Sequence, residues 1–491
     1  MSTPFRLYNT LTREVAAFEP LTQDTVRLYV CGMTVYDDCH AGHARAMVVF
    51  DTFSRHLRAS GWTVIFVRNF TDVDDKIIRR AAENGQDPSA LAQHYIDRFH
   101  RDVAALGLAA PDMEPRVTTH LEAIETIIAE LVAADHAYVS EGSVWFDVAS
   151  FPRYGALSGQ KTDSLDASAD ASDGKRSPHD FALWKAAKPE EPAWESPWGP
   201  GRPGWHIECS AMARTTLGAT VDIHGGGLDL VFPHHENEIA QSECANRAPF
   251  ANVWMHNGLL TMPGGRKMGK SEGNAFSIGD LLVLWPAEAL RVYYLQNHYR
   301  SPLVWSEEAM PDALAMVARL YDAREVAERM VGAGEPTAVA AELGPDAHAV
   351  LEASSRMKAE FLAALNEDFN TARALGVAFE LARAVNRLSN HKKAAMRGGP
   401  VAREALAALR LLPTHLGLLC QDTSAWNAEL TVKVLPRRGL TAADVDAKLL
   451  ERTAARATKD WARADAVRAE LDAAGVVVMD REGATEWRVR V

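Results

Sequence analysis

Two kinds of hydrophobic pattern alternate near the start of the chain. The run LYVCG (28–32) is short, apolar and rich in β-forming residues, so it predicts a buried strand. HARAMVVFDTFSRHLRAS (43–60) has helical spacing of its apolar residues, and Gly61 ends the predicted helix. WTVIFVRNF (62–70) supplies a second strand. A strand, a helix and a strand in this order predict a parallel sheet with helices on its faces.

The same alternation returns much later in the chain. VDIHGGG (221–227) predicts a strand ending in a glycine turn, HHENE (234–238) lies in a predicted helix, and VWMHNGLLTM (253–262) predicts another strand. The stretch 161–203 between the two halves is rich in Ser, Asp, Pro, Gly and Trp, which predicts a loop-dominated insertion with mobile portions. We therefore expect one α/β domain that is interrupted by an insertion.

A different pattern begins near residue 311. Apolar residues recur with i, i+3, i+4 spacing up to residue 419, which predicts a helical bundle. The segment 421–439 predicts a linker, and after it come a final pair of helices and a small hairpin around residues 482–483. The expected fold is a Rossmann-like parallel-sheet domain split by an insertion, followed by an all-α bundle and a small C-terminal α+β domain.

The composition excludes several classes of protein. With 491 residues the chain is long enough for several domains, and 47% hydrophobic and 24% charged residues are ordinary for a soluble globular protein. The N-terminus lacks the features of a signal peptide, and no apolar run reaches the roughly 18 residues that cross a bilayer, so no membrane contact is expected. Five scattered cysteines do not form a disulfide pattern, which fits a reducing cytoplasm.

The stretch FPHHENEIAQSEC (232–244) carries candidate metal ligands. His234 and Glu238 lie four residues apart and so share one face of a helix. Imidazole and carboxylate groups both bind zinc, although the second histidine of the zinc-protease motif is missing. The alternative is a solvated helix start. Cys31 and Cys209 complete a zinc set if the fold brings them there, and are otherwise buried structural cysteines.

Two further stretches are suited to phosphate chemistry. HAGH places His40 and His43 at the start of the first predicted helix, where unpaired N–H groups and the helix dipole favour anions. In GGRKMGKSEGN (264–274), Lys267 and Lys270 lie in a glycine-rich loop suited to closing over a triphosphate, although P-loop spacing is absent. The alternatives are polar residues at a helix start and an exposed basic turn.

The last part of the chain is its least acidic region. Residues 401–491 contain 14 Lys and Arg against 13 Asp and Glu, or +1, whereas the whole chain carries −13. Four basic residues have the spacing of one stripe on a single helix: Arg452, Arg456, Lys459 and Arg463. Together with Trp487 they offer charge and stacking to unpaired bases, while ion pairs with neighbouring acids are the alternative.

Several motifs extend in one order over nearly the whole chain. They are CGMTVYD, HAGH, WHIECSAM, HGGGLDLVFPHHENEIAQSE, KMGKS, NEDFNTARALGVAFELARAVNR and KDWARADAVRAEL. Together they resemble the cysteine–tRNA ligase family of class I aminoacyl-tRNA synthetases. The resemblance implies ligation of L-cysteine to tRNA(Cys) through a cysteinyl-adenylate, with ATP and Mg²⁺, and one Zn²⁺ per subunit that selects the thiol. We also expect a cytoplasmic protein and a monomer.

The resemblance implies roles for individual residues. The zinc ligands fall on Cys31, Cys209, His234 and Glu238. Catalysis and ATP binding fall on His40, His43, Lys267 and Lys270. The family lines its cysteine pocket at the positions of Thr71, Trp205 and Asp229. Anticodon contacts are expected from Arg452, Arg456, Lys459, Arg463 and Trp487.

Two positions depart from the family pattern. Ala41 stands where isoleucine is usual, and Gly269 where serine is usual, so the loop gains backbone freedom. Both changes leave the imidazole and ammonium groups in place, and we expect them to affect rate more than reaction type. The rival interpretations are a ligase that joins cysteine to an amino-sugar and a synthetase-like binding protein without activity.

The expected domains follow the order of the motifs. They are the first half of the catalytic domain (1–120), a connective insertion (121–203), the second half (204–265), the KMGKS loop and stem-contact region (266–310), the helical bundle (311–420), a linker (421–439) and an anticodon-binding domain (440–491).

Overall fold

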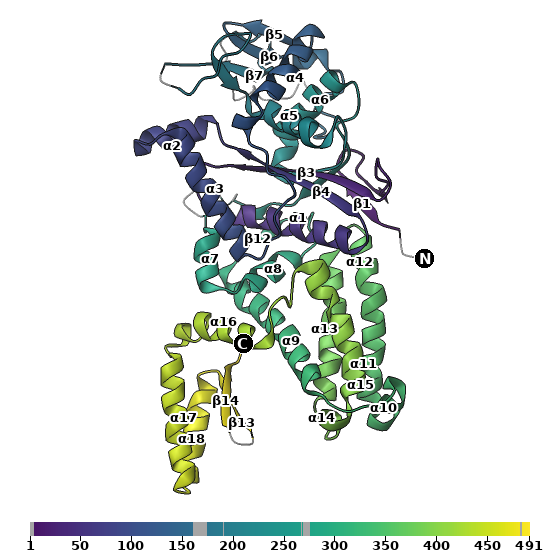
Figure 1. Cartoon of the computed structure of the whole chain (residues 1–491), viewed down its shortest axis with the longest axis vertical. Helices are drawn as coiled ribbons and strands as arrows, with labels where there is room; N and C mark the ends of the chain where they lie inside the picture. The colour runs from purple at the N-terminus through teal and green to yellow at the C-terminus, as the bar shows by residue number, and fades with distance from the viewer. Residues whose placement is uncertain (1–3, 161–173, 190, 267, 269–274, 482–483) are drawn as a thin grey trace.

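The computed structural model describes the chain except for residues 1–3, 161–173, 190, 267, 269–274 and 482–483. The molecule is elongated, with the insertion at one end and the parallel sheet next to it (Figure 1). The helical bundle and the C-terminal domain lie at the other end, where they diverge as two separate lobes (Figure 1).

The predicted parallel sheet is confirmed. Its four strands lie in the order β10–β9–β3–β4 and are Ala251–Asn257, Val221–Gly227, Thr25–Thr34 and Thr63–Thr71. All neighbouring strands are parallel. Helix α1 (Ala41–Ala59) connects β3 to β4, so the first predicted unit is a βαβ unit. Strand β9 pairs directly with β3, which joins the two halves of the domain across the insertion.

Side chains of β3 point alternately into two cores. Leu28 and Val30 pack into the core that contains α1 and the bundle helices. Tyr29 points the other way, into a core shared with the insertion, α5 (Trp205–Leu217) and α6 (Glu236–Asn246). The sheet is therefore covered on both faces, as its continuous apolar strands require.

The insertion contains a folded layer, to which the segment 161–203 contributes two strands; the other described residues of this segment lie in loops, as the sequence predicts. Helix α4 (Leu121–Ala133) packs beside an antiparallel sheet in the order β5–β6–β7–β8. These strands are Ala137–Ser140, Ser143–Phe146, Phe181–Ala186 and Gly201–Pro203. Phe181 and Trp184 of β7 are fully buried, so apolar residues inside the polar stretch form the strand. Mobile portions are expected somewhere within 161–203, and residues 161–173 and 190 of this segment lie outside the described residues.

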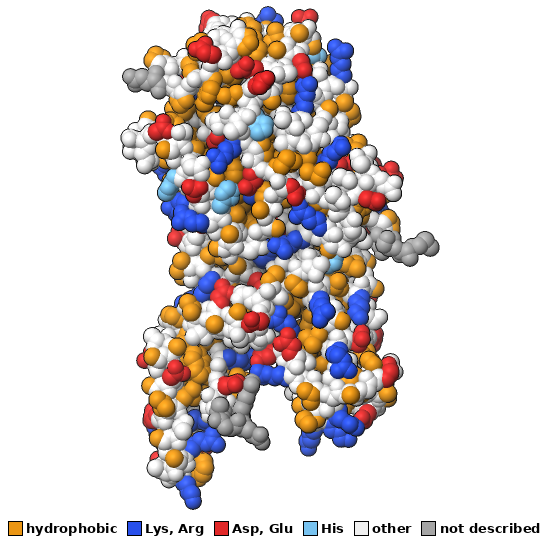
Figure 2. Space-filling model, viewed as in Figure 1, with side chains coloured by type: hydrophobic (Ala, Val, Ile, Leu, Met, Phe, Trp, Pro, Cys, Tyr) orange, Lys and Arg blue, Asp and Glu red, His pale blue; other side chains and the backbone are white. Residues whose placement is uncertain are grey.

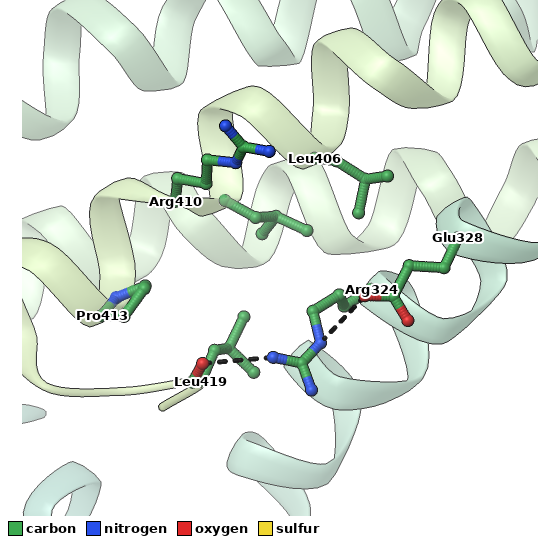
Figure 3. Close-up of a pocket in the computed structure, with 7 residues that line it drawn as sticks. Arg324, Glu328, Leu406, Arg410, Pro413 and Leu419 are labelled. Atoms are coloured by element: carbon green, nitrogen blue, oxygen red, sulfur yellow. Dashed lines mark hydrogen bonds and ion pairs between the residues drawn. The ribbon is translucent and has the colours of Figure 1, made fainter. Parts of the chain in front are cut away.

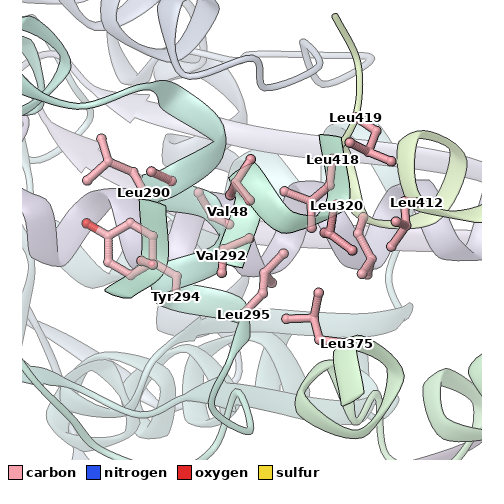
Figure 4. Packing of buried hydrophobic residues seen from close by; sticks show 14 of the residues in the cluster. Val48, Leu290, Val292, Tyr294, Leu295, Leu320, Leu375, Leu412, Leu418 and Leu419 are labelled. Carbon is pink, nitrogen blue, oxygen red and sulfur yellow. The ribbon is translucent and has the colours of Figure 1, made fainter. Parts of the chain in front are cut away.

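Helices dominate the second half, as predicted. The main ones are α7 (Ile278–Leu284), α8 (Ala287–Leu295), α9 (Met310–Arg329), α10 (Pro336–Leu343), α11 (Pro345–Arg356), α13 (Thr371–Leu388) and α15 (Gly399–Leu409). Val48 of α1 lies among side chains of α8 and α9 (Figure 4). Beside them, buried Arg291 of α8 donates to Asp51 of α1 at 2.7 Å. The sheet domain and the bundle thus share one core.

The C-terminal region begins with a helix where the sequence predicts a linker. Helix α16 (Thr423–Lys433) occupies most of 421–439, and its Trp426 is buried against Tyr321 of α9, with ring centroids 4.4 Å apart. The predicted helix pair and hairpin are confirmed as α17 (Ala442–Ala457), α18 (Trp461–Ala473), β13 (Val476–Arg481) and β14 (Ala484–Val489). None of the described helices has the length and apolar composition needed to span a membrane.

Candidate metal centre and active site

Four candidate metal ligands from distant parts of the chain meet at the carboxyl edge of the sheet. Cys31 lies in β3, Cys209 in α5, His234 in a π-helical turn (Val231–His235) and Glu238 in α6. One ligand atom from each lies within 4.8 Å of all the others. Open parallel sheets bind their ligands at this edge. The structure therefore brings together all four residues that the sequence suggested for a metal.

Short contacts connect the four groups. Nε2 of His234 lies 2.7 Å from Oε1 of Glu238, so their four-residue spacing places them together as predicted. Sγ of Cys31 lies 3.4 Å from the same oxygen and 3.8 Å from Sγ of Cys209. Cys209, His234 and Glu238 are buried. Two sulfurs, an imidazole nitrogen and a carboxylate oxygen in one buried cluster are the donor set that zinc prefers.

The local backbone explains how Cys31 reaches the cluster. The pairing of β3 with β4 shifts register between Val30 and Met33, and Cys31 and Gly32 lie in this irregular step. A Cβ atom on Gly32 would lie 1.6 Å from the carbonyl oxygen of Asn69 in β4, so only glycine permits this approach. Gly32 N also donates to Oδ1 of Asn69 at 2.8 Å.

The cluster strongly perturbs its own pKa values. Burial raises the pKa of Cys31 well above its usual range, and the thiol that it donates to Cys209 lowers the pKa of Cys209 to about 6. Burial lowers the pKa of His234, but the Glu238 carboxylate and Cys209 outweigh this and raise it to about 10. Burial opposes ionisation of Glu238 as well, yet His224 and His234 hold its pKa well below normal. These shifts favour the ionised forms of Cys209 and Glu238 beside a protonated His234.

The structure adds two histidines that the sequence interpretation missed. Nε2 of His224, in β9, lies 3.0 Å from Oε2 of Glu238 and 3.5 Å from Sγ of Cys31. Nε2 of His235 lies 3.3 Å from the same sulfur, and its Nδ1 lies 2.7 Å from Nε2 of His256. Cys31, His224, His235 and Glu238 therefore form a second possible ligand set. Both histidines occur in motifs quoted above, but strand and turn residues have no spacing rule that links them to Glu238.

The three residues suggested for a cysteine pocket differ in their contacts with the cluster. Trp205, the first residue of α5, stacks on His234 with ring centroids 4.3 Å apart. Thr71 ends β4, and its hydroxyl donates to Oε2 of Glu208 at 2.8 Å. Burial raises the pKa of Glu208 well above normal; the residue lies in the quoted motif WHIECSAM, but the sequence interpretation gives it no role. Asp229 is exposed in the short turn Leu228–Leu230 that follows β9.

HAGH begins α1 as predicted, and its histidines also cap the helix. Nδ1 of His40 accepts from Gly42 N at 3.1 Å, and Nδ1 of His43 accepts from His40 N at 3.3 Å. The two rings stack with centroids 3.8 Å apart. The segment after the KMGKS loop lies against this helix start, because Ala41 N donates to the carbonyl of Phe276 at 2.9 Å. Lys267 and Lys270 lie outside the described residues.

The four basic residues expected on one C-terminal helix lie on two helices, which corrects the single stripe. Helix α17 ends at Ala457, Lys459 has φ +61°, and Asp460 caps α18 by accepting from Arg463 N at 3.0 Å. Lys459 therefore lies in the turn between the two helices.

The arginines of this region are paired with acids, as the alternative interpretation expected. Arg452 is buried and donates to both oxygens of Asp480 at 2.7 Å, which joins α17 to β13. Arg456 also pairs with Asp480, at 3.1 Å. Arg463 pairs with Glu451 and Glu470. Trp487 is partly buried, and its Nε1 donates to Asp446 at 2.9 Å.

Comparison with known protein families assigns the three main parts of the chain. Residues 17–315 match the tRNA synthetases class I (C) catalytic domain, 360–420 match the DALR domain, and 438–488 match the cysteinyl-tRNA ligase anticodon binding domain. Methionyl-tRNA synthetase of Mycobacterium tuberculosis, bound to methionyl-adenylate, has the same fold, with TM-scores of 0.61 and 0.63 in two structures at 16% and 15% identity. In both comparisons 80% of this chain and 92% of the other are covered. The fold and the catalytic domain are those of a class I aminoacyl-tRNA synthetase.

Relatives of similar length define the family more narrowly. Cysteine–tRNA ligases of Halorhodospira halophila and Alkalilimnicola ehrlichii are both 48% identical to this chain, over 98% of it and 99% of their own length. That of Methylococcus capsulatus is 47% identical with the same coverage. The chain belongs to the cysteine–tRNA ligase family. Its activity is the ATP-dependent aminoacylation of tRNA with cysteine.

Proposed function

We propose that Cys31, Cys209, His234 and Glu238 hold one zinc ion per chain and that this ion selects cysteine through its thiol. The convergence of the four donors within 4.8 Å in a buried cluster carries the proposal. When bound, zinc supplies a soft Lewis acid that binds a thiolate strongly and an alcohol weakly. Serine differs from cysteine by one atom, and shape alone discriminates such small changes by only about 1–3 kcal/mol.

The protein's own residues position the amino acid beside this cluster. Trp205 stacks on His234, and Thr71 at the end of β4 donates to Glu208, the neighbour of Cys209, so we place both residues beside the bound amino acid. We assign Asp229 to the ammonium group of the substrate, because its exposed carboxylate lies at the end of β9 on the same sheet edge. A carboxylate at this position orients the substrate without taking part in bond making.

Adenylate formation is assigned to the two signature motifs. The cysteine carboxylate attacks the α-phosphate of ATP, which releases pyrophosphate and gives cysteinyl-adenylate, with Mg²⁺ accompanying the nucleotide. His40 and His43 at the start of α1 and Lys267 and Lys270 of the KMGKS loop stabilise the charge on the transferring phosphate. A terminal ribose hydroxyl of tRNA(Cys) then attacks the acyl carbon of the adenylate, which forms the ester and releases AMP. No side-chain nucleophile is required.

The tRNA side of the proposal retains Arg456, Lys459, Arg463 and Trp487 as anticodon contacts. Arg452 serves the fold instead, because its buried pair with Asp480 holds α17 to β13. The exposed ion pairs of Arg456 and Arg463 exchange for phosphate at little cost, since water and salt screen such surface pairs. We further propose a cytoplasmic monomer with the domain boundaries given above, in which 421–439 contains helix α16.

Metal analysis together with substrate selection tests the zinc assignment. Cys209→Ser removes one donor, and Cys244→Ser is the matched control, because Cys244 also lies in this half of the domain but outside both ligand sets. We expect about one zinc per chain in the wild type and the control, a large loss in Cys209→Ser, and a rise of serine relative to cysteine in ATP–pyrophosphate exchange. Full zinc content and unchanged selectivity in Cys209→Ser would remove this residue from the metal site.

A further inference from the structure

The C-terminal domain, residues 440–491, follows α16 and lies beside the helical bundle (Figure 1). Figure 2 shows an open space between these two lobes on the face in view. One attachment lies at α16, which contacts β14, and Arg438 next to this helix donates to the carbonyl oxygens of Gly475 and Arg490. The guanidinium of Arg437 stacks on Trp285, 3.8 Å from the ring centroid, and so holds the same junction to the rest of the chain. Because these contacts all lie at one junction, a contact with another helix constrains the angle of the domain further.

Arg488 of β14 makes the second attachment. Successive side chains of a strand point to opposite faces, and Trp487 faces α17, where it donates to Asp446. Arg488 faces the bundle helix α9. Its Nη1 lies 2.5 Å from Oδ1 of Asp322 and 2.9 Å from Oε2 of Glu325. Glu325 is largely buried, with 11% of its side chain exposed, so water weakens this contact less than an ordinary surface ion pair.

Helix α9 presents the two carboxylates from a rigid position. Tyr321 stacks on Trp426 with an interplanar angle of 4°. Arg324 donates to the carbonyl of Leu419 at 3.1 Å and to Thr423 at 3.3 Å, on the edge of a hollow of about 180 Å³ (Figure 3). Helix α9, which carries both carboxylates, is therefore held against α16 and the turn before it.

We propose that Arg488 is a positioning residue that sets the angle between the anticodon-binding domain and the catalytic domain. A tRNA is contacted at two distant ends, and binding at one end helps the other only if the protein holds both sites at the correct separation. The ion pairs of Arg488 with Asp322 and Glu325 fix this separation before tRNA arrives. The inference rests on the tRNA-charging function of the chain and adds a residue that touches neither reacting group.

A direct contact between Arg488 and tRNA phosphate is the competing explanation, and acid-removing variants separate the two. Asp322→Asn with Glu325→Gln breaks the attachment but leaves Arg488 in place and removes two negative charges from α9. A phosphate contact predicts equal or tighter tRNA binding in this double variant, because its arginine is freed. A positioning role predicts the same loss as in Arg488→Gln. Arg490→Gln is the matched control, since Arg490 pairs at 2.9 Å with Asp472 inside the C-terminal domain.

The experiment compares kcat/KM for tRNA with cysteine-dependent ATP–pyrophosphate exchange. We expect a loss of about tenfold in charging for Arg488→Gln and for the double variant, through KM for tRNA, while exchange and the Arg490→Gln control stay within about twofold. Charging of an acceptor-stem minihelix, which does not reach the anticodon domain, is expected to be unchanged. Unimpaired charging by the double variant, or an equal loss with the minihelix, would overturn the proposal. Failure of the wild type in cysteine-dependent exchange would instead contradict the function on which it rests.

Discussion

A buried pair of histidines between the catalytic domain and the bundle predicts a loss of stability in acid. His56, near the end of α1, is fully buried, and its Nδ1 lies 3.0 Å from Nδ1 of His415. Its Nε2 lies 3.0 Å from Oδ1 of Asn366, which only accepts hydrogen bonds. His56 therefore carries its proton on Nε2 and accepts from His415 on Nδ1. A second proton on His56 would break this arrangement.

The size of the effect follows from the two pKa values. Burial lowers the pKa of His56 to about 3, with a further contribution from His415, and burial lowers the pKa of His415 to about 4. An unfolded histidine titrates near 6.5, so between about pH 6.5 and 4 the unfolded state binds protons that the folded state excludes. Stability therefore falls as the pH falls. At pH 5, about 1.5 units below 6.5, each histidine costs about 2 kcal/mol, or about 4 kcal/mol for the pair.

Denaturant unfolding at pH 8 and pH 5 measures this difference. His415→Gln replaces one imidazole with an amide that still donates to His56, and we expect its loss of stability between the two pH values to be about 2 kcal/mol smaller than in the wild type. Other buried histidines titrate in both proteins and cancel. His348→Gln, at an exposed position, is the control and is expected to behave as the wild type. The same loss in wild type and His415→Gln would refute the reasoning.

Two further substitutions test the C-terminal fold and the metal edge. Arg452→Gln removes two hydrogen bonds of 2.7 Å to Asp480, so we expect the C-terminal domain to lose about 2 kcal/mol of folding stability. The loss is measured as a lower temperature of its thermal transition, while cysteine-dependent ATP–pyrophosphate exchange is preserved. An unchanged transition temperature would contradict a structural role of Arg452. Gly32→Ala places a methyl group 1.6 Å from a backbone oxygen of β4, so we expect the variant to fold poorly or to contain no zinc by metal analysis. A variant that folds and binds a full equivalent of zinc would show that this position does not require glycine.

The sequence predicted the elements that follow periodic rules. The βαβ unit, the start of α1 at His40 and the shared face of His234 and Glu238 all depend on local spacing, and all three are confirmed. The boundary between α17 and α18, which the sequence interpretation missed, also has a local signal. Asp460 is a typical helix N-cap residue, and it separates Lys459 from the next helix without any glycine or proline.

Elements defined by distant contacts escaped the sequence interpretation. Pro436 and Gly439 made 421–439 resemble a linker, but Trp426 gains its burial from Tyr321, about a hundred residues earlier, and so stabilises α16. Strand β7 likewise depends on pairing with β6 rather than on its polar neighbours. Tertiary packing outweighs local composition in both segments.

The choice between the two ligand sets rests on the same kind of distant contact. Both contain Cys31 and Glu238, so the question is whether Cys209 and His234 or His224 and His235 complete the site. His235 is already engaged with His256, and His224 stacks under Tyr29 with ring centroids 5.3 Å apart. Only the first set contributes a second sulfur, and zinc binds thiolate in preference to additional imidazole where both are offered. His234 of that set also stacks on Trp205, which is assigned to the proposed cysteine pocket, so the proposal places the substrate thiol on the sulfur-rich side.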